Sequence, residues 1–290
     1  MSFEKISLTA KLTAYMRQFS DVPFAKDVAR VVGAQQAFDE LLRAHQLSPD
    51  DLLWYAPIFE ARYESIAARL RASGIAQVLE LASGLSLRGL AMTEADPGLT
   101  YVETDLEALT AEKQALVTRL RQERHLPDRP TYLLRAADAL EPEQVWAATA
   151  TLDRARPLAV VSEGLLQYLS PAELGGVTAN IRALLAGFAP GSLWITPDFS
   201  FKDEVAPLSE RQRRFRAVVT AATDRQMYDG AFADRAALEE FLGGFGLHAQ
   251  QLFQLDEVTH LTSPGALGLA PETVDRLRKR LRLWLVKLAA

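Results

Sequence analysis

The chain has 290 residues, an apolar fraction of 49%, a charged fraction of 24% and a formal net charge of −5 at pH 7. These are the proportions of an ordinary globular protein, and the absence of a basic excess argues against nucleic-acid binding. The lack of cysteine excludes disulfides, thiol catalysis and cysteine-ligated metals. No apolar run approaches the ~18 residues of a membrane span, and the N-terminus has no hydrophobic signal core. We therefore expect a soluble, cytoplasmic protein without nucleic-acid or membrane partners.

Residues 1–73 are predicted to form a helical N-terminal cap. This region is rich in alanine, leucine, arginine and glutamine, and has almost no glycine. Residues 50–73 carry apolar side chains at helical spacing, which predicts a helix that packs one face against the rest of the protein. Gly74 follows directly and is predicted to end that helix as a C-cap.

Residues 74–200 are predicted to form an α/β core. Short apolar runs alternate with helical stretches, and the runs are 77–82, 99–105, 131–138, 157–164 and 192–199. Such alternation predicts a Rossmann-like, mostly parallel sheet with helices on both faces. The runs are almost continuously apolar, which suits strands that are buried on both sides.

Residues 201–290 are predicted to add a lid helix and the last strands of the sheet. A basic helical stretch, which contains Arg211, Arg213, Arg214 and Arg216, is followed by a second helix and two strand-like runs near 247–255 and 281–288. The two runs suggest an antiparallel pair at the edge of the sheet. The arginines form either a solvated helix face or a lid that favours an anionic ligand. With no repeat or linker, we favour one domain over 1–290.

Acidic residues end most of the predicted strands. In an open parallel sheet, ligands bind beyond the carboxyl ends of the strands. Glu103 and Asp105 end the second run, where an acidic side chain can bind both hydroxyls of a ribose. Asp138, after the third run, either accepts a hydrogen bond from an adenine amine or caps the next helix. Glu163, after the fourth run, is expected to line the cleft because a carboxylate inside the sheet would be costly. Such an edge suits an adenosine-containing ligand.

The turn after the first strand is unlike a dinucleotide-binding loop. Against the pattern G-x-G-x-x-G, the three positions are Ala82, Gly84 and Leu87, so two of the three glycines are missing. A nicotinamide-dependent oxidoreductase is therefore disfavoured. Gly84 can still allow a ligand close to the backbone, and the alternative is a tight turn that binds nothing.

Four segments together resemble the leucine carboxyl methyltransferase family, which includes bacterial O-methyltransferases of polyketide and other small-molecule pathways. They are VLELASGLSLRGLAM (78–92), YVETDLEALTAEKQALV (101–117), RAADAL (135–140) and VVSEGLLQYLSPAEL (160–174). The resemblance covers residues 60–200. It implies a seven-stranded Rossmann-like sheet that binds S-adenosylmethionine.

The resemblance also implies roles for individual residues around the cofactor. The loop from Glu80 through Ala82 to Gly84 would lie under the methionine moiety. Arg88, Arg62 and more weakly Lys26 would contact the cofactor carboxylate. Asp105 would lie on the ribose side, Asp138 and Ala139 on the adenine side, and Glu163 would face the cleft, while Glu103 is a cofactor-binding candidate from its position at the strand end.

The predicted activity is in-line methyl transfer to an oxygen of a small molecule or a chain terminus. A carboxylate acceptor is already ionised and needs no general base, whereas a hydroxyl needs one. None of the four histidines follows a predicted core strand, so we favour a carboxylate or an acidic hydroxyl, with Glu163 or Tyr168 as the candidate catalytic groups. No metal site is expected. The alternative is a non-catalytic cofactor-binding or interaction protein, because the loop departs from the family pattern at Ala82, Ser86 and Leu87.

Overall fold

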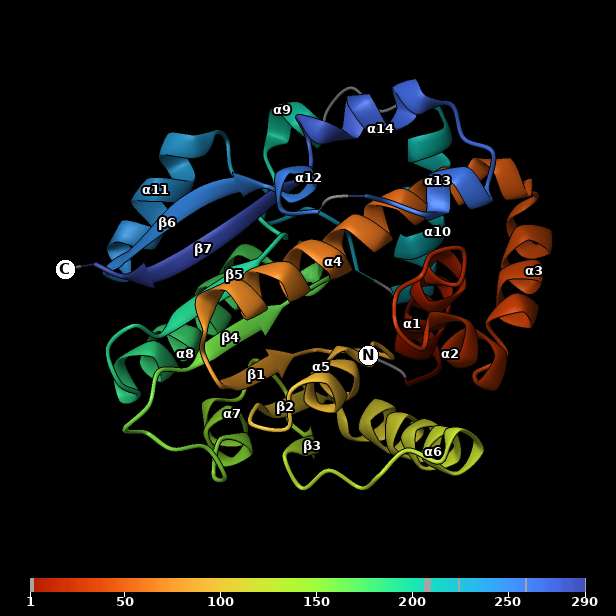
Figure 1. The fold of residues 1–290 in the computed structure, drawn as a ribbon. Coiled ribbons are helices and arrows are strands. Elements are labelled where there is room, and N and C mark those ends of the chain that lie inside the picture. Colours follow the sequence, from red (N-terminus) through yellow and green to blue (C-terminus); the bar gives the residue numbers. More distant parts are fainter. Residues whose placement is uncertain (1–2, 206–209, 224, 259, 290) are drawn as a thin grey trace.

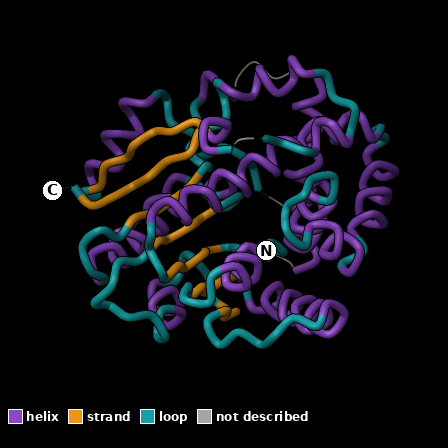
Figure 2. The backbone as a smooth tube through the Cα atoms, in the orientation of Figure 1, coloured by secondary structure: helices purple, strands orange, loops and turns teal. Residues whose placement is uncertain are grey.

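The seven-stranded sheet predicted from the sequence is present, with helices on both of its faces (Figures 1 and 2). The computed structural model describes residues 3–205, 210–223, 225–258 and 260–289. The order of strands across the sheet is β3-β2-β1-β4-β5-β7-β6. The strands are β1 (Gln77–Leu81), β2 (Thr100–Asp105), β3 (Tyr132–Ala136), β4 (Ala159–Ser162), β5 (Leu193–Thr196), β6 (Leu247–Phe253) and β7 (Arg282–Leu288).

The strand order reverses between β1 and β4, and this reversal positions the site. β1 pairs in parallel with both β2 and β4. The chain builds the sheet outward from β1 through β2 to β3, and then returns to build it in the opposite direction from β4 to β5. An open α/β sheet binds its ligands in the crevice at such a switch point. The two C-terminal strands are antiparallel to each other as expected, but only β6 is at the edge, because β7 lies between β5 and β6.

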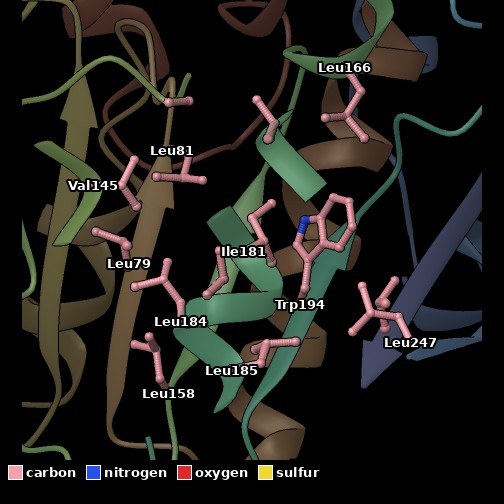
Figure 3. Close-up of a cluster of buried hydrophobic side chains, with 14 of the residues drawn as sticks. Leu79, Leu81, Val145, Leu158, Leu166, Ile181, Leu184, Leu185, Trp194 and Leu247 are labelled. Atoms are coloured by element: carbon pink, nitrogen blue, oxygen red, sulfur yellow. The ribbon is translucent and has the colours of Figure 1, made fainter. Parts of the chain in front are cut away.

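Alternate residues of each central strand pack against different helix layers. Leu79 of β1 and Trp194 of β5 belong to the cluster shown in Figure 3, which contains side chains of α7 (Pro142–Ala148), α8 (Pro171–Gly187) and α11 (Arg235–Gly244). Their neighbours Val78 and Ile195 belong to a second cluster with α4 (Ala56–Ser73) and α5 (Arg88–Ala95). Because successive strand residues point to opposite faces, burial on both sides requires the nearly continuous apolar runs seen in the sequence.

Helices α1, α2 and α3 pack beyond the carboxyl end of β1, together with α10 (Figure 1). One apolar cluster joins α1, α2, α3 and α6 to the loop after β1 and to α10. The helices are α1 (Phe3–Arg17), α2 (Ala25–Val31), α3 (Ala34–His45), α4 (Ala56–Ser73), α5 (Arg88–Ala95), α6 (Glu107–Arg124), α7 (Pro142–Ala148), α8 (Pro171–Gly187), α9 (Lys202–Val205), α10 (Glu210–Thr223), α11 (Arg235–Gly244), α12 (Gln254–Glu257), α13 (Ser263–Ala266) and α14 (Pro271–Arg278).

The helix predicted over 50–73 is shorter than expected. Residues 49–55 form two single 3₁₀ turns, Pro49–Asp51 and Leu53–Tyr55, and α4 begins only at Ala56. Pro57 lies in the first turn of α4, where its missing N–H costs nothing. Gly74 ends α4 in the left-handed conformation, with φ of 65°, as predicted.

Candidate functional site

A cavity of about 860 Å³ lies at the carboxyl edge of the sheet. It is lined by the segments that follow β1 to β5, by α1, α4 and α10, and by the residues that lead into β7. Small-molecule sites usually fall between roughly 300 and 1,000 Å³, so this cavity is at the large end of that range. The segments that the sequence analysis singled out therefore meet at one site.

The loop after β1 adopts the conformation of a glycine-rich loop, although it contains only one glycine. Ala82 has φ of 51° and Gly84 has φ of 55°, and both line the cavity. An L-residue rarely adopts the left-handed conformation, and glycine adopts it freely. The Ser83 N–H donates to the Thr104 carbonyl at 2.9 Å, which joins the loop to β2. This hydrogen bond holds the loop in the conformation of a glycine-rich loop, in which the backbone of Ala82 is strained because its φ is positive.

Asp105 and Asp138 both line the cavity, at the ends of β2 and β3. Asp105 is buried and accepts the N–H of Gly84 at 2.7 Å and that of Leu106 at 2.8 Å. Burial raises the pKa of Asp105, and these two N–H donors partly offset that rise. Asp138 accepts the N–H of Leu140 at 2.9 Å, so it also shapes its own loop. Ala139 lines the cavity beside it, and its N–H bonds to no other described residue.

Glu103 lies beneath the loop and is not among the residues that line the cavity. Its carboxylate accepts the Gly89 N–H at 2.7 Å and the Tyr132 hydroxyl at 2.7 Å, and forms an ion pair with Lys113 at 2.6 Å. A Cβ on Gly89 would lie 2.7 Å from the Tyr101 ring and 2.9 Å from Glu103. Glu103 therefore holds α5 against β2 and β3, and Gly89 permits that close approach. The sequence analysis missed both Gly89 and Lys113.

Arg88 is fully buried and does not line the cavity. Its guanidinium bonds to Glu80 and, at 2.5 Å, to Glu163, while the Tyr101 hydroxyl donates to Glu80 at 2.6 Å. Burial alone would lower the pKa of Arg88, but Glu80 and Glu163 hold it well above its ordinary value. Both ends of the guanidinium are therefore occupied by protein carboxylates, unlike the cofactor contact expected from the sequence.

Arg17 is a cavity-lining cation that the sequence analysis missed. It is the last residue of α1, and its guanidinium forms a 2.5 Å ion pair with Glu163. Arg17 and Arg88 both lie over the ring of Tyr63, at 5.3 Å and 4.7 Å from its centroid. Burial would raise the pKa of Glu163, but Arg17 and Arg88 together lower it. No motif marks Arg17, because its partner lies far away in the sequence.

Arg62 lines the cavity as expected, and its guanidinium pairs with Asp198, which follows β5. Asp198 also accepts N–H groups of the loop after β4, from Gly164 at 2.9 Å and from Leu165 at 2.8 Å. It therefore joins α4 to the ends of β4 and β5. The sequence placed Asp198 at the end of a strand, but gave it no role.

The remaining candidates are divided between the cavity and the surface. Tyr168 lines the cavity, and burial raises its pKa to about 12. Lys26 is exposed on α2 and is not among the lining residues. Within the described ranges, none of the four histidines lines the cavity.

The basic segment around α10 is divided in the same way. Arg213 and Arg214 are exposed and pair with Glu210, whereas Arg216 lines the cavity. The side chain of Arg211 lies outside the described residues. Arg213 and Arg214 therefore belong to the solvated helix face, whereas a role of this segment as a lid stays a prediction that concerns Arg216.

In the part of the chain that the structure describes, no cluster of three His, Asp or Glu side chains is arranged to hold a metal ion. None of the helices in that part combines the length and the apolar character that crossing a membrane requires.

The chain is similar to known proteins in fold and in sequence. A solved structure of a DUF574 family protein from Streptomyces avermitilis MA-4680 has the same fold, with a TM-score of 0.60, 19% identity and 97% coverage of both chains. Two relatives from Mycolicibacterium paratuberculosis (strain ATCC BAA-968 / K-10) are provisionally named S-adenosyl-L-methionine-dependent methyltransferases. One is 31% identical over 78% of this chain and 73% of its own length. The other is 32% identical over 59% of this chain, which spans 55% of that relative. The leucine carboxyl methyltransferase family model matches residues 16–182, so the chain belongs to this family.

Proposed function

We propose that the protein is an S-adenosylmethionine-dependent O-methyltransferase that methylates a carboxylate or an acidic hydroxyl of a small molecule or a chain terminus. The observation that carries this proposal is the order of polar groups along the cavity. Asp138, Asp105, Gly84 and Glu163 follow β3, β2, β1 and β4, which are successive neighbours in the sheet. The relatives named above are the second support for this proposal.

This order matches the parts of the cofactor from one end to the other. The adenine would lie beside Asp138 and the free N–H of Ala139, which offer an acceptor and a donor to its edge. Asp105 is next in the sheet and can accept hydrogen bonds from ribose hydroxyls. The amino-acid end then falls over β1 and β4, close to Glu163 and Arg17. The lining residues therefore fit the cofactor along its whole length.

The amino-acid end of the cofactor carries an ammonium and a carboxylate, so it needs partners of both signs. Glu163 can accept from the ammonium, while Arg17 and Arg62 line the cavity and can donate to the carboxylate. Arg88 is less suited to direct contact, since Glu80 and Glu163 already occupy it. We therefore assign Arg88 the role of positioning Glu163, and assign carboxylate binding to Arg17 and Arg62. Lys26 has no role in this arrangement.

The chemistry needs orientation more than proton transfer. When bound, S-adenosylmethionine would supply a methyl group activated by a sulfonium, and the protein would orient the two reactants and exclude water. Glu163 is a weak base because two arginines lower its pKa, and Tyr168, with a pKa of about 12, stays protonated at neutral pH. An acceptor that arrives already ionised fits these residues best.

Calorimetric titration with S-adenosylmethionine tests the proposal, with NADH as the control ligand. We expect micromolar binding of S-adenosylmethionine, equivalent to about −8 kcal/mol, and none of NADH. Turnover is then followed as release of S-adenosylhomocysteine with a panel of carboxylic acids. Binding without turnover on any acceptor would favour a non-catalytic cofactor-binding protein. Failure to bind S-adenosylmethionine would exclude both functions.

A further inference from the structure

The part of the cavity away from the strand ends is lined by aromatic and cationic side chains. Trp54, Tyr55 and Phe59 line it from the start of α4 and the turn before it, and Tyr228 lines it from the segment after α10. The cofactor assignment above uses none of these residues. This region is therefore the place for the methyl acceptor, and its chemistry restricts what the acceptor can be.

Most of the cations that line the cavity are neutralised by acidic partners. Arg225 pairs with Glu173 at 2.7 Å, and Arg282 pairs with Glu204. Arg17 and Arg62 pair with Glu163 and Asp198, as described above. Among the described residues, only Arg216 and Arg280 line the cavity without an acidic partner. Arg280 is exposed, whereas Arg216 is half-buried.

Arg216 is held against an aromatic ring instead of a carboxylate. Its guanidinium lies over the ring of Tyr228, at 4.4 Å from the centroid. Tyr228 is fixed in turn, because its N–H donates to the Gln167 carbonyl at 2.7 Å. Stacking on a ring orients a guanidinium and leaves its N–H donors free for a planar anion.

Tyr228 also places Arg216 beside the proposed reaction centre. The segment after β4 contains Gln167, which accepts the Tyr228 N–H, and this segment also donates N–H groups to Asp198, the partner of Arg62. Arg62 belongs to the group that surrounds the amino-acid end of the cofactor. An anion bound to Arg216 would therefore lie close to the methyl donor. Asp203 also lines the cavity, and none of the described basic residues pairs with it, but it is exposed.

We propose that Arg216, stacked on Tyr228, binds the ionised group of the acceptor, and that the acceptor is an organic anion with an aromatic or apolar body. This inference rests on the proposed function. The side chains of Trp54, Tyr55 and Phe59 would contact the body of the acceptor. Arg216 would direct the charged oxygen of the acceptor toward the methyl group. A carboxylate acceptor uses a lone pair to form the new carbon–oxygen bond as the carbon–sulfur bond breaks. It becomes a neutral ester without losing a proton.

Two probes of matched shape test the inference on the full chain saturated with S-adenosylhomocysteine. The probes are 3-phenylpropionate, which is anionic, and 3-phenylpropionamide, which is neutral. We expect the wild-type protein to prefer the carboxylate by about fivefold or more, since a charge-assisted bond is roughly twice as strong as a neutral one. Arg216→Gln should abolish this preference, and Arg216→Lys should retain part of it.

Arg214→Gln is the matched control, because Arg214 is on the same helix, is exposed and does not line the cavity. Its preference for the carboxylate should equal that of the wild type. Equal binding of the two probes to the wild type, no binding of either, or a preference that survives in Arg216→Gln would each overturn the inference. A titration with S-adenosylhomocysteine, made before either probe is added, separates the two claims. Failure there overturns the proposed function, whereas success there and failure with the probes overturns only the role of Arg216.

Discussion

The guanidinium of Arg17 lies 2.5 Å from a carboxylate oxygen of Glu163, which joins the end of α1 to the loop after β4. Glu163 is shared with Arg88, which is bound in turn to Glu80. The four side chains form an alternating row of charges from the N-terminal helices to β1. All four are largely buried, so each charge depends on its neighbours for compensation.

Arg17→Gln should weaken binding of S-adenosylmethionine by about tenfold or more, which corresponds to about 1.4 kcal/mol. The same substitution should leave binding of 5′-methylthioadenosine nearly unchanged, because that nucleoside lacks the amino-acid carboxylate. Calorimetry with both ligands measures the difference. Arg30→Gln is the control, since Arg30 is exposed on α2 and is not among the residues that line the cavity. An equal loss of both ligands would mean that Arg17 acts only through the fold.

Arg88→Met should destabilise the protein by about 3–5 kcal/mol, because it leaves Glu80 buried without its cation. Urea unfolding of the apo protein measures this loss without any ligand. The double variant Glu80→Gln/Arg88→Met should recover part of the stability, since it removes the uncompensated charge. A stable Arg88→Met protein that has lost only cofactor affinity would instead restore the direct contact expected from the sequence.

Ala82→Gly should stabilise the protein by about 0.5–1 kcal/mol. Relief of the left-handed strain at Ala82 outweighs the greater entropy that glycine has in the unfolded chain. Ala115→Gly is the control and should lower the stability instead. Ala115 is exposed within α6, where a glycine costs about 0.5–1 kcal/mol. Thermal unfolding of the two variants compares them directly. A lower midpoint for Ala82→Gly than for the wild type would contradict the strain at this position.

Glu173→Gln should destabilise the protein at neutral pH and have less effect in acid. Arg225 and the capping box with Ser170 hold the pKa of Glu173 at about 2, below its ordinary value. A lowered pKa gives stability that is present above about pH 4.5 and is lost as the pH falls toward 2. Because the pair is partly exposed and screened, we expect a cost of only about 1 kcal/mol at pH 7. Urea unfolding across this pH range measures it, and a cost that does not change with pH would disprove the linkage.

The sheet could be predicted from the sequence because its signals are local. Alternating apolar runs and helical stretches depend on neighbouring residues, and so does a capping box such as that of Ser170 and Glu173 at the start of α8. The acids at the strand ends were found by the same logic. Asp105, Asp138 and Glu163 all reach the cavity, since the topology of a parallel sheet brings strand ends together.

The ion pairs of the site could not be predicted in this way. The partners of Arg17 and Arg62 are 146 and 136 residues away, and no local pattern connects them. The family resemblance implied that Arg88 contacts the cofactor. The local sequence does not reveal that Glu80 and Glu163 enclose its guanidinium in the fold. Ala82 was recognised as a departure from the family pattern, but its positive φ appears only in the folded loop.

The position of β7 in the sheet has a consequence for the order in which the molecule forms. β7 is the last of the seven strands in the sequence, yet it lies between β5 and β6 and pairs with both. During synthesis, β5 and β6 leave the ribosome first, each with an unpaired edge that only a later segment can cover. Such exposed edges are sites of aggregation in incomplete chains. The sheet therefore closes only after residues 282–288 are made, and a chain interrupted before them would keep both edges open.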